Sequence, residues 1–462
     1  MISTVNELLV DEYIRRVREL NAGLSRRAYV FTFGCQQNEA DAERMLGMAR
    51  DMGYKITDTA EDADLILINT CAIREHAELK ALSMLGRFKA LKRKNPELII
   101  GVCGCMTAQP HRAELIKNDF HYVSFTTEPN MIHRIPELIL GYMERRKRAF
   151  VFGADTGDIV EGVPVLRRES HKAFVSIMYG CNNFCSYCIV PYVRGRERSR
   201  CSEDIISECR TLVVSGVREI TLLGQNVNSY RPDIGFAELI SEIAEIEGDF
   251  IIRFMTSHPK DTSDELIEAM RKYRGKIAPY FHLPLQAGSN SVLRAMNRTY
   301  TREHYLEILK KLRAAVPDIA VSTDIIVGFP GESEQDFLDT LDVLKTAEFD
   351  MVYAFLYSAR EGTRAAAMTE QVPREVKDER MSRLLALQDG ISYKKNERFV
   401  GRVCRVLVDS KETREGCVVY TGRNPENKLV HFTSDYAVEI GELVNVKIEK
   451  HGAFDLIGTM EK

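Results

Sequence analysis

Short apolar runs alternate with stretches of helical apolar spacing over residues 1–150. One helix is expected to begin at an N-cap Asn38 and to stop near Gly53, because apolar residues recur between them every three or four positions. Four apolar runs are the expected strands: residues 28–33, 64–69, 97–102 and 121–126. Strands that alternate with helices in this way predict a parallel sheet of the flavodoxin or Rossmann type.

The middle of the chain continues this alternation over a longer stretch. Six apolar runs are the expected strands: residues 173–178, 219–224, 250–255, 279–285, 319–328 and 351–357. Six parallel strand–helix units predict a partial barrel of the TIM type, whose active site lies at the carboxyl end of the strands.

The pattern changes after Pro373. A helix is expected from Arg374 to about Lys395, with four apolar residues pointing inward: Met381, Leu384, Leu385 and Ile391. Five alternating runs follow, broken by Gly, Asn and Asp: residues 402–410, 416–422, 428–433, 443–450 and 454–460. They predict a small antiparallel barrel of the OB-like class, which often holds nucleic acid. The chain is therefore expected to be α/β, with three domains: 1–150, 165–390 and 393–462.

Composition and charge indicate the class of protein to which these domains belong. The 462 residues are 45% hydrophobic and 28% charged, which is typical of a globular protein with several cores. A net charge of −4 argues against a protein that coats nucleic acid without specificity. The N-terminus carries Glu7, Asp11 and Glu12 where a signal peptide needs an apolar core, and no apolar run is long enough to span a bilayer. We expect a cytoplasmic protein with no membrane contact and, because no coiled coil is evident, a monomer.

Eleven cysteines are many for a cytosolic protein, in which disulfides are rare, so some of them are candidates for metal or redox chemistry. Cys35, Cys71 and Cys105 each follow one of the first three expected strands. In open parallel sheets, ligands bind beyond the carboxyl ends of the strands. If the strand before Cys35 lies between the other two, in a flavodoxin-like order, the three thiols converge on one metal site.

A second thiol set lies directly after the first strand of the middle region. Cys181, Cys185 and Cys188 occupy the stretch GCNNFCSYC, with gaps of three and two residues. Three thiolates suit a [4Fe–4S] cluster with one iron left open, because a closed zinc site needs a fourth protein ligand. S-adenosylmethionine fits that open iron through its amino and carboxylate groups, and its reductive cleavage releases a 5′-deoxyadenosyl radical.

This motif, with Tyr187 before its last cysteine, resembles that of the radical S-adenosylmethionine enzymes. Within that group the chain resembles the methylthiotransferases from about Ala28 to its C-terminus, where the tail is similar to the RNA-binding TRAM domain. Eight blocks carry the resemblance: GCQQNEADAER at Gly34, INTCAIRE at Ile68, GCMTAQ at Gly104, LLGQNVNSY at Leu222, TSHP at Thr256, HLPLQAGSN at His282, TDIIVGFPGE at Thr323 and LYSAREGT at Leu356.

The resemblance implies two [4Fe–4S] clusters with different tasks. Cys181, Cys185 and Cys188 would hold the cluster that cleaves S-adenosylmethionine. An auxiliary cluster on Cys35, Cys71 and Cys105 would bind sulfur, which one S-adenosylmethionine methylates while a second supplies the radical. Six residues at or near strand ends are the expected S-adenosylmethionine contacts: Tyr187, Gln225, Asn226, Gln286, Ser289 and Asp324.

The chain looks most like the family members that act on isopentenylated adenosine beside the anticodon. The implied reaction is methylthiolation of carbon 2 of N6-isopentenyladenosine at position 37 of tRNA, with the anticodon stem-loop as partner and flavodoxin or ferredoxin as electron donor. Two alternatives keep the chemistry and change the substrate, to N6-threonylcarbamoyladenosine or to an aspartate of a ribosomal protein. An alternative from another class is a non-catalytic iron–sulfur sensor that binds RNA.

Three positions depart from the family pattern. Cys201 stands where proline is usual, and Ala287 where serine is commoner. Cys103 is an additional thiol beside Cys105, and because a strand aims residues two apart to the same side, either could bind iron. The context G-C-M-x-x-Q favours Cys105.

Other residues have structural interpretations. Cys209, Cys404 and Cys417 are expected to be packed thiols, Cys201 inert and His258 a satisfied histidine. Four arginines follow the three-cysteine motif: Arg194, Arg196, Arg198 and Arg200. They form either a solvated turn or contacts to tRNA phosphates or to the cofactor carboxylate.

Overall fold

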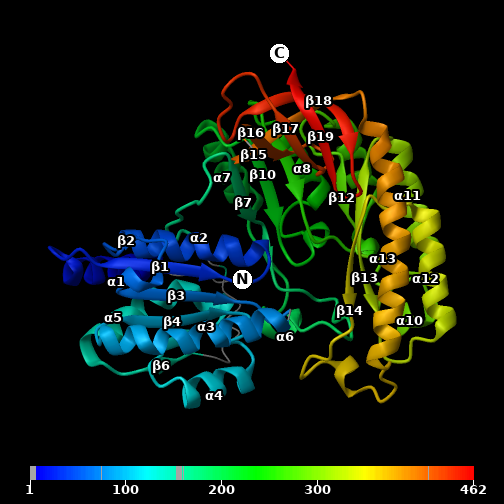
Figure 1. The fold of residues 1–462 in the computed structure, drawn as a ribbon. Helices are drawn as coiled ribbons and strands as arrows, with labels where there is room; N and C mark the ends of the chain where they lie inside the picture. The colour runs from blue at the N-terminus through cyan, green and yellow to red at the C-terminus, as the bar shows by residue number, and fades with distance from the viewer. Residues whose placement is uncertain (1–6, 74, 152–158, 160, 415, 462) are drawn as a thin grey trace. The chain divides into compact units, whose positions relative to one another are not determined.

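The computed structural model describes residues 7–73, 75–151, 159, 161–414 and 416–461. The chain forms two compact units (Figure 1). The first unit comprises Met1–Arg168, Met178–Asn182 and Cys188–Arg200, and the second comprises Glu169–Ile177, Asn183–Tyr187 and Cys201–Lys462. Among the described residues, no helix has the length and apolar character needed to cross a membrane.

The first unit is built on a parallel six-stranded sheet in the order β2-β1-β3-β4-β5-β6. Its strands are β1 (Arg27–Thr32), β2 (Lys55–Ile56), β3 (Leu65–Thr70), β4 (Ile99–Gly104), β5 (Phe125–Thr127) and β6 (Ala149–Phe150). The order 2-1-3-4-5 is that of flavodoxin, which confirms the predicted fold class. The two-residue strand β2 was missed in the sequence, so the predicted central strand was wrong: β3, which precedes Cys71, lies between β1 and β4.

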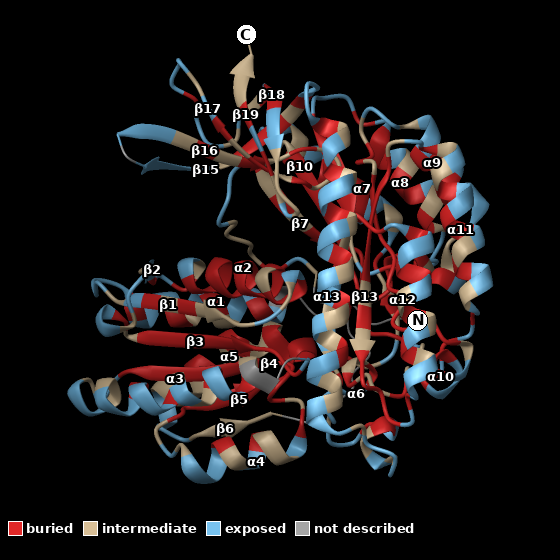
Figure 2. Cartoon of the chain, turned by 45° about the vertical axis from the view of Figure 1, so that its right-hand side comes forward, coloured by how far each residue is buried: buried red, intermediate tan, exposed pale blue. Residues whose placement is uncertain are grey.

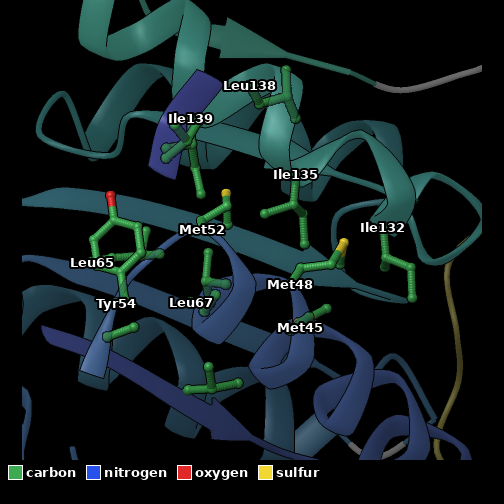
Figure 3. Close-up of a cluster of buried hydrophobic side chains, with 14 of the residues drawn as sticks. Met45, Met48, Met52, Tyr54, Leu65, Leu67, Ile132, Ile135, Leu138 and Ile139 are labelled. Carbon is green, nitrogen blue, oxygen red and sulfur yellow. The ribbon is translucent and has the colours of Figure 1, made fainter. Parts of the chain in front are cut away.

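Helices cover both faces of this sheet. They are α1 (Glu7–Asn21), α2 (Gln36–Asp51), α3 (Glu75–Lys94), α4 (Pro110–Asp119) and α5 (Ile135–Arg145). Strand β3 is buried along its whole length (Figure 2) and alternates its side chains between two apolar cores. Leu65 and Leu67 pack with Met48 of α2 and Ile135 of α5 (Figure 3), whereas Ile68 packs on the other face. A strand covered on both faces needs a continuous apolar run, as this one has.

The second unit begins with six parallel strands in two three-stranded sheets. The first sheet has the order β11-β10-β7 and the second β12-β13-β14. The strands are β7 (Lys172–Ser176), β10 (Glu219–Leu223), β11 (Ile251–Phe254), β12 (Tyr280–His282), β13 (Ala320–Val327) and β14 (Met351–Leu356). A parallel bridge between Ile252 and Ile277 links the two halves, which confirms the partial barrel.

Helices follow these strands as in other α/β barrels: α7 (Ser202–Val214), α8 (Phe236–Ala244), α9 (Asp264–Lys272), α10 (Asn290–Ala295), α11 (Arg302–Ala315) and α12 (Glu334–Ala347). Cys209 on α7 is fully buried, as predicted for a packed thiol.

The tail closes into a five-stranded barrel in the order β15-β16-β17-β19-β18. Its strands are β15 (Val403–Arg414), β16 (Cys417–Arg423), β17 (Leu429–Thr433), β18 (Leu443–His451) and β19 (Asp455–Glu461). The predicted barrel is confirmed, although one pair, β17 with β19, is parallel. Cys404 lies in the barrel core as expected. The prediction for Cys417 was wrong: this thiol is exposed at the start of β16, where the hairpin leaves the barrel.

Helix α13 (Arg374–Asn396) joins the half-barrel to the tail and buries a polar stripe. The buried residues recur every four positions: Arg380, Leu384, Gln388, Ser392 and Asn396. Leu385 is 43% exposed, so its predicted inward position was wrong. The Gln388 side chain donates to the Phe349 carbonyl (2.9 Å) and that of Asn396 to the Gly452 carbonyl (3.0 Å). Hydrogen bonds to backbone carbonyls therefore take the place of apolar packing on this helix.

An acidic residue at the base of the half-barrel gathers three cations. Asp350 is 2% exposed, and its carboxylate lies 2.9 Å from Arg398, 3.2 Å from Lys428 and 3.7 Å from Lys395. The Val321 amide donates to the same carboxylate at 3.0 Å. Since Lys428 belongs to the tail barrel and Val321 to β13, Asp350 fastens the tail to the half-barrel.

A second buried ion pair supports the same junction. Arg253 of β11 lies 2.6 Å from the Glu219 carboxylate and donates to the carbonyls of Asn424 and Pro425, each at 2.8 Å. The tail loop at 424–428 is therefore bound by two charged side chains of the half-barrel, Arg253 and Asp350, which makes its position a property of the folded unit.

We expect Asp350→Asn to lower the free energy of unfolding of the second unit by about 3–5 kcal/mol, because it leaves buried cations without their counter-charge. Urea unfolding followed by circular dichroism measures this loss. Asp318→Asn is the matched control, since its ion pair with Arg274 is half exposed and costs less than about 1 kcal/mol to remove. Equal stability of the two variants would contradict the role of Asp350.

Candidate functional site: two sets of three thiols

The three thiols of the first unit lie at the carboxyl ends of neighbouring strands. Cys35 follows β1, Cys71 follows β3 and Cys105 follows β4, and the amide of Cys105 donates to the Thr70 carbonyl at 2.9 Å. Burial raises the pKa of the Cys105 thiol to about 12 against the opposing charge of Arg194, and the nearby Cys71 and Cys35 thiols add to the rise. The structure thus brings together the three thiols that the sequence placed at one sheet edge.

A buried amide links two of these loops. Helix α2 begins at Gln36 with Cys35 as its N-cap residue, so the predicted N-cap Asn38 was wrong. Asn38 lies inside the first turn with no exposed surface, and its Nδ2 donates to the Thr70 carbonyl at 2.9 Å. Its Oδ1 lies 3.3 Å from the Cys35 sulfur. Asn38 therefore joins the start of α2 to the end of β3 instead of capping a helix.

Arg194 reaches the same place from the segment that follows the three-cysteine motif. The Nε of Arg194 lies 3.2 Å from the Cys105 sulfur, and its Nη2 lies 2.9 Å from the Asp41 carboxylate and 3.2 Å from the Asn38 Oδ1. Only 4% of Arg194 is exposed. Burial alone would lower the pKa of Arg194, but Cys105 and Asp41 raise it above its ordinary value. The guanidinium is therefore a charged donor directed at a thiol.

The other three arginines of this run differ in burial. Arg198 is buried and donates to the Asn130 side chain at 3.0 Å, and the buried Arg200 pairs with Glu161. Arg196 is exposed. A solvated turn is thus wrong for three of the four, because Arg194, Arg198 and Arg200 are buried and hydrogen-bonded inside the first unit.

Cys103 and Cys105 have different surroundings. Cys103 is fully buried in the apolar core, and burial raises the pKa of its thiol far above the ordinary value. Gly104 between them has φ +99°, which turns the chain and breaks the alternation of the strand. A side chain at Gly104 would meet the Thr70 carbonyl at 2.4 Å. This geometry favours Cys105 as the thiol that joins Cys35 and Cys71, because Cys103 remains a packed, protonated thiol.

The three-cysteine motif occupies the loop between β8 (Met178–Tyr179) and α6 (Val190–Val193). Cys181 is 9% exposed, and its amide donates to the Gly195 carbonyl at 3.1 Å. Cys185 and Cys188 are half-buried. Cys181 and Cys188 belong to the first unit and Cys185 to the second, so this one loop contributes two thiols to the first unit and one to the second.

An arginine that the sequence analysis missed accompanies Cys185. Arg298 is 8% exposed, and its Nη1 lies 3.4 Å from the Cys185 sulfur. Its other nitrogens donate to the Tyr300 hydroxyl and the Pro284 carbonyl, both at 2.8 Å. Arg298 stands alone in a short turn after α10, so nothing in the local sequence distinguishes it from a surface arginine.

The predicted S-adenosylmethionine contacts lie in the second unit, at or near strand ends. Asn226 is 1% exposed and donates to Asp261 at 2.8 Å, while its buried Oδ1 has no partner among the described residues. Gln286 has φ +74°, and its amide donates to the Asp324 carbonyl at 2.8 Å. Ser289 bonds Ser291 (2.7 Å) and Asp336, so its hydroxyl already serves the packing of α10.

The remaining expected contacts are more open. Gln225 and Tyr187 are half-buried. Asp324 is half-buried with its carboxylate 3.6 Å from His282. The unpaired Asn226 oxygen and the Asp324 carboxylate are suited to a ligand with amino and hydroxyl groups; all six contacts stay predictions.

His258 has the structural role expected for it, and the inertness expected of Cys201 stays a prediction. Burial, then the charges of Arg298 and Lys260, lower the pKa of His258 to about 2, and its Nδ1 accepts the Lys260 amide. Cys201 is exposed with its sulfur 3.6 Å from Asp233.

Two aromatic side chains on β14 were not singled out in the sequence. Tyr353 and Phe355 are 41% and 40% exposed, and they pair in register with Asp324 and Ile326 of β13. Residues two apart share one face of a strand, so the carboxyl half of this sheet presents two rings beside a carboxylate. The ring of His282 meets that of Tyr353 edge-on at 5.8 Å.

Comparison with known proteins shows the family to which the chain belongs. Residues 175–344 match the radical SAM superfamily, and residues 27–126 match the uncharacterized protein family UPF0004. The chain is 48% identical to the tRNA-2-methylthio-N(6)-dimethylallyladenosine synthase of Thermoanaerobacter sp. (strain X514), covering 99% of this chain and 98% of that protein. The synthase of that name from Clostridioides difficile is 44% identical over 97% of this chain. The chain belongs to this synthase family.

Solved structures support the fold of this family member at the level of architecture. The radical S-adenosylmethionine methyltransferase TsrM from Kitasatospora setae, with cobalamin and a [4Fe-4S] cluster bound, has a TM-score of 0.56 at 13% identity. The similar region covers 74% of this chain and 77% of the TsrM chain.

We expect Gly180→Ala to destabilise the first unit by about 1–3 kcal/mol, because a left-handed residue with a side chain is strained. Gly180 has φ +77°, and an added Cβ would lie 2.0 Å from the Arg196 carbonyl oxygen. Thermal unfolding measures the loss. Gly86→Ala is the control: Gly86 is an exposed position of α3 with open space around it, where alanine stabilises by about 0.5–1 kcal/mol. An unchanged Gly180→Ala protein would contradict the tight turn before Cys181.

Proposed function

We propose that this chain methylthiolates carbon 2 of N6-isopentenyladenosine at position 37 of tRNA. The observation that carries the proposal is the presence of two separate three-thiol sets in a chain related over its full length to tRNA-2-methylthio-N(6)-dimethylallyladenosine synthases. One set would suffice for radical chemistry alone. A second set at a sheet edge is the additional site that sulfur insertion requires.

The two donor sets fit iron–sulfur clusters better than single metal ions. Among the described residues, no group of three or more His, Cys, Asp or Glu is placed to hold one metal ion. Thiolates are the ligands of iron–sulfur clusters, whose iron atoms occupy separate corners and so accept more widely spaced sulfurs. Cys181, Cys185 and Cys188 would hold the radical cluster. Cys35, Cys71 and Cys105 would hold the auxiliary one.

When bound, the two clusters and S-adenosylmethionine supply the radical, the sulfur and the methyl group. The protein positions these groups and the substrate. Asn226 and Asp324 offer polar atoms to S-adenosylmethionine at the carboxyl ends of β10 and β13. An aromatic C–H carbon has no acidic proton at neutral pH, so the reaction needs no general base, and a neutral His258 is compatible with it.

The partners follow from this chemistry. The tail barrel belongs to a class that binds nucleic acid, and we assign it to the anticodon stem-loop. A flavodoxin- or ferredoxin-type protein would deliver the electron. We place the enzyme in the cytoplasm, where its tRNA substrate is found, and propose that it acts as a monomer, because the six thiols and the tail barrel are all supplied by one chain.

The substrate is tested in cells that lack this gene, with and without the gene restored. Mass spectrometry of digested tRNA should show loss of the methylthio group and accumulation of plain isopentenyladenosine, with recovery on restoration. Unchanged isopentenyladenosine modification would overturn the proposal, and purified enzyme would then be assayed on threonylcarbamoyladenosine and on the ribosomal aspartate.

The two thiol sets are expected to fail in different ways. Cys185→Ala should abolish 5′-deoxyadenosine formation, whereas Cys71→Ala should keep it and lose methylthio transfer, because only the auxiliary site supplies sulfur. Chromatography of both products measures the split. Cys209→Ala, which removes a packed thiol of α7, should keep both activities. Sulfur insertion by the Cys71→Ala enzyme would refute the auxiliary site.

The exposed rings of β14 are expected to bind the substrate base by stacking. Tyr353→Ala should raise KM for an isopentenylated stem-loop roughly tenfold, since base–aromatic stacking contributes about 1–3 kcal/mol. Tyr393→Ala is the matched control, because Tyr393 is 56% exposed on α13. Equal KM values for the two variants would exclude this role of Tyr353.

A further inference from the structure

Each of the two thiol sets is in contact with one buried arginine. Arg194 donates to Cys105 at 3.2 Å, and Arg298 donates to Cys185 at 3.4 Å. Both guanidinium groups are almost removed from solvent, with 4% and 8% of each residue exposed. A buried charge is costly unless it is compensated, so the partners of each arginine decide how much positive charge its thiol experiences.

Arg194 has a carboxylate partner. Asp41 lies 2.9 Å from its Nη2 and is itself buried, with 2% of the residue exposed. Asp41 is shared with Arg44 at 3.3 Å, and the Arg44 guanidinium lies over the ring of Tyr179. The positive charge next to Cys105 is therefore partly offset by the Asp41 carboxylate bound to the same guanidinium.

Arg298 has only neutral partners besides the thiol. They are the Tyr300 hydroxyl and the Pro284 carbonyl, and no carboxylate of the described residues forms an ion pair with Arg298. The charge of Arg298 also acts on His258: after burial, Arg298 is the largest cause of the lowered pKa of His258. The positive charge next to Cys185 is thus uncompensated.

This difference has a direct consequence for redox chemistry. The reduction potential of an iron–sulfur cluster depends on net charge, on hydrogen bonds to its sulfurs and on burial. Reduction adds one negative charge, so a nearby uncompensated cation stabilises the reduced form and raises the potential. A cation already paired with a carboxylate has a smaller effect, because the two charges nearly cancel at the cluster.

We propose that Arg298 and the Arg194–Asp41 pair set the two clusters at different potentials, so that an electron from a low-potential flavodoxin- or ferredoxin-type donor resides on the radical cluster and not on the auxiliary one. The inference rests on the proposed function, since it needs both clusters. One electron leaves the donor, which is oxidised, and enters the radical cluster, which is reduced; no bond changes in this step. Arg194, Asp41 and Arg298 are positioning residues here.

The experiment measures each potential separately in anaerobically reconstituted full-length protein. Changing Cys35, Cys71 and Cys105 to Ala leaves only the radical cluster, and changing Cys181, Cys185 and Cys188 to Ala leaves only the auxiliary one. Redox titration followed by electron paramagnetic resonance gives the midpoint potential of each. In the unaltered arginine background, we expect the radical cluster to have the higher potential.

The variants are expected to shift the midpoint potentials in different directions. Arg298→Gln should shift the radical cluster to a more negative potential, and Arg298→Lys should restore part of the shift, because it returns the charge. Asp41→Asn should shift the auxiliary cluster to a more positive potential, because it removes the compensating charge from Arg194. Arg194→Gln should shift the auxiliary cluster negatively and by less than Arg298→Gln shifts the radical cluster.

Arg380→Gln is the matched control for loss of a buried arginine. Arg380 is 4% exposed and pairs with Glu332 at 2.8 Å, and none of its bonds is to a thiol. Its variant should leave both potentials unchanged.

Three results would overturn the inference. The first is a radical cluster whose potential is no higher than that of the auxiliary cluster when the arginines are unaltered. The second is an Arg298→Gln protein whose radical cluster keeps the parental potential. The third is an Asp41→Asn protein whose auxiliary potential is unchanged or more negative. Failure of the parent protein to bind two clusters is a different outcome, since it refutes the proposed function itself.

Discussion

A buried guanidinium needs compensating groups, and those of Arg194 lie where strand ends of the first unit meet. Its partners are Cys105, which follows β4, and Asn38 and Asp41 of α2. Arg194 itself follows the three-cysteine motif by six residues. Ile189 and Val193 add apolar contacts to Cys105. The segment after Cys188 is thereby part of the flavodoxin-like unit, and one of the three thiols at the sheet edge is bound by a residue far away in the sequence.

Buried charges are also compensated by distant partners where the tail barrel meets the half-barrel. Asp350 compensates three cations, and Arg253 binds Glu219 and two tail carbonyls. Buried charges of this kind add less stability than apolar packing of equal volume, but an unpaired one is strongly penalised, so they specify one arrangement. The tail barrel is thereby held in one position relative to the half-barrel.

Features that depend on local spacing could be predicted from the sequence. The strands, the half-barrel, the five-stranded tail and the convergence of Cys35, Cys71 and Cys105 all follow from apolar periodicity and from the rule that parallel strands end at one edge. The spacing of Cys181, Cys185 and Cys188 carries its own chemistry, because few groups are satisfied by three thiolates.

Features that depend on distant partners could not be predicted. Asn38 resembles an N-cap in sequence, yet it is held inside α2 by the Thr70 carbonyl. The buried stripe of α13 is polar because its partners are backbone carbonyls of other elements. Arg298 has no local signal at all, and the two-residue strand β2 is too short for periodicity to detect. Each of these errors concerns a polar group whose partner lies elsewhere in the chain, or an element shorter than the pattern that would reveal it.

We propose that the two thiol sets hold one four-iron cluster each. The most direct test is the iron and sulfide content, with Mössbauer spectra, of anaerobically reconstituted protein in which Cys35, Cys71 and Cys105 are all changed to Ala. We expect the altered protein to contain half of the iron and sulfide of the parent protein and to keep the spectrum of one [4Fe–4S] cluster. Iron content equal to that of the parent protein would contradict it.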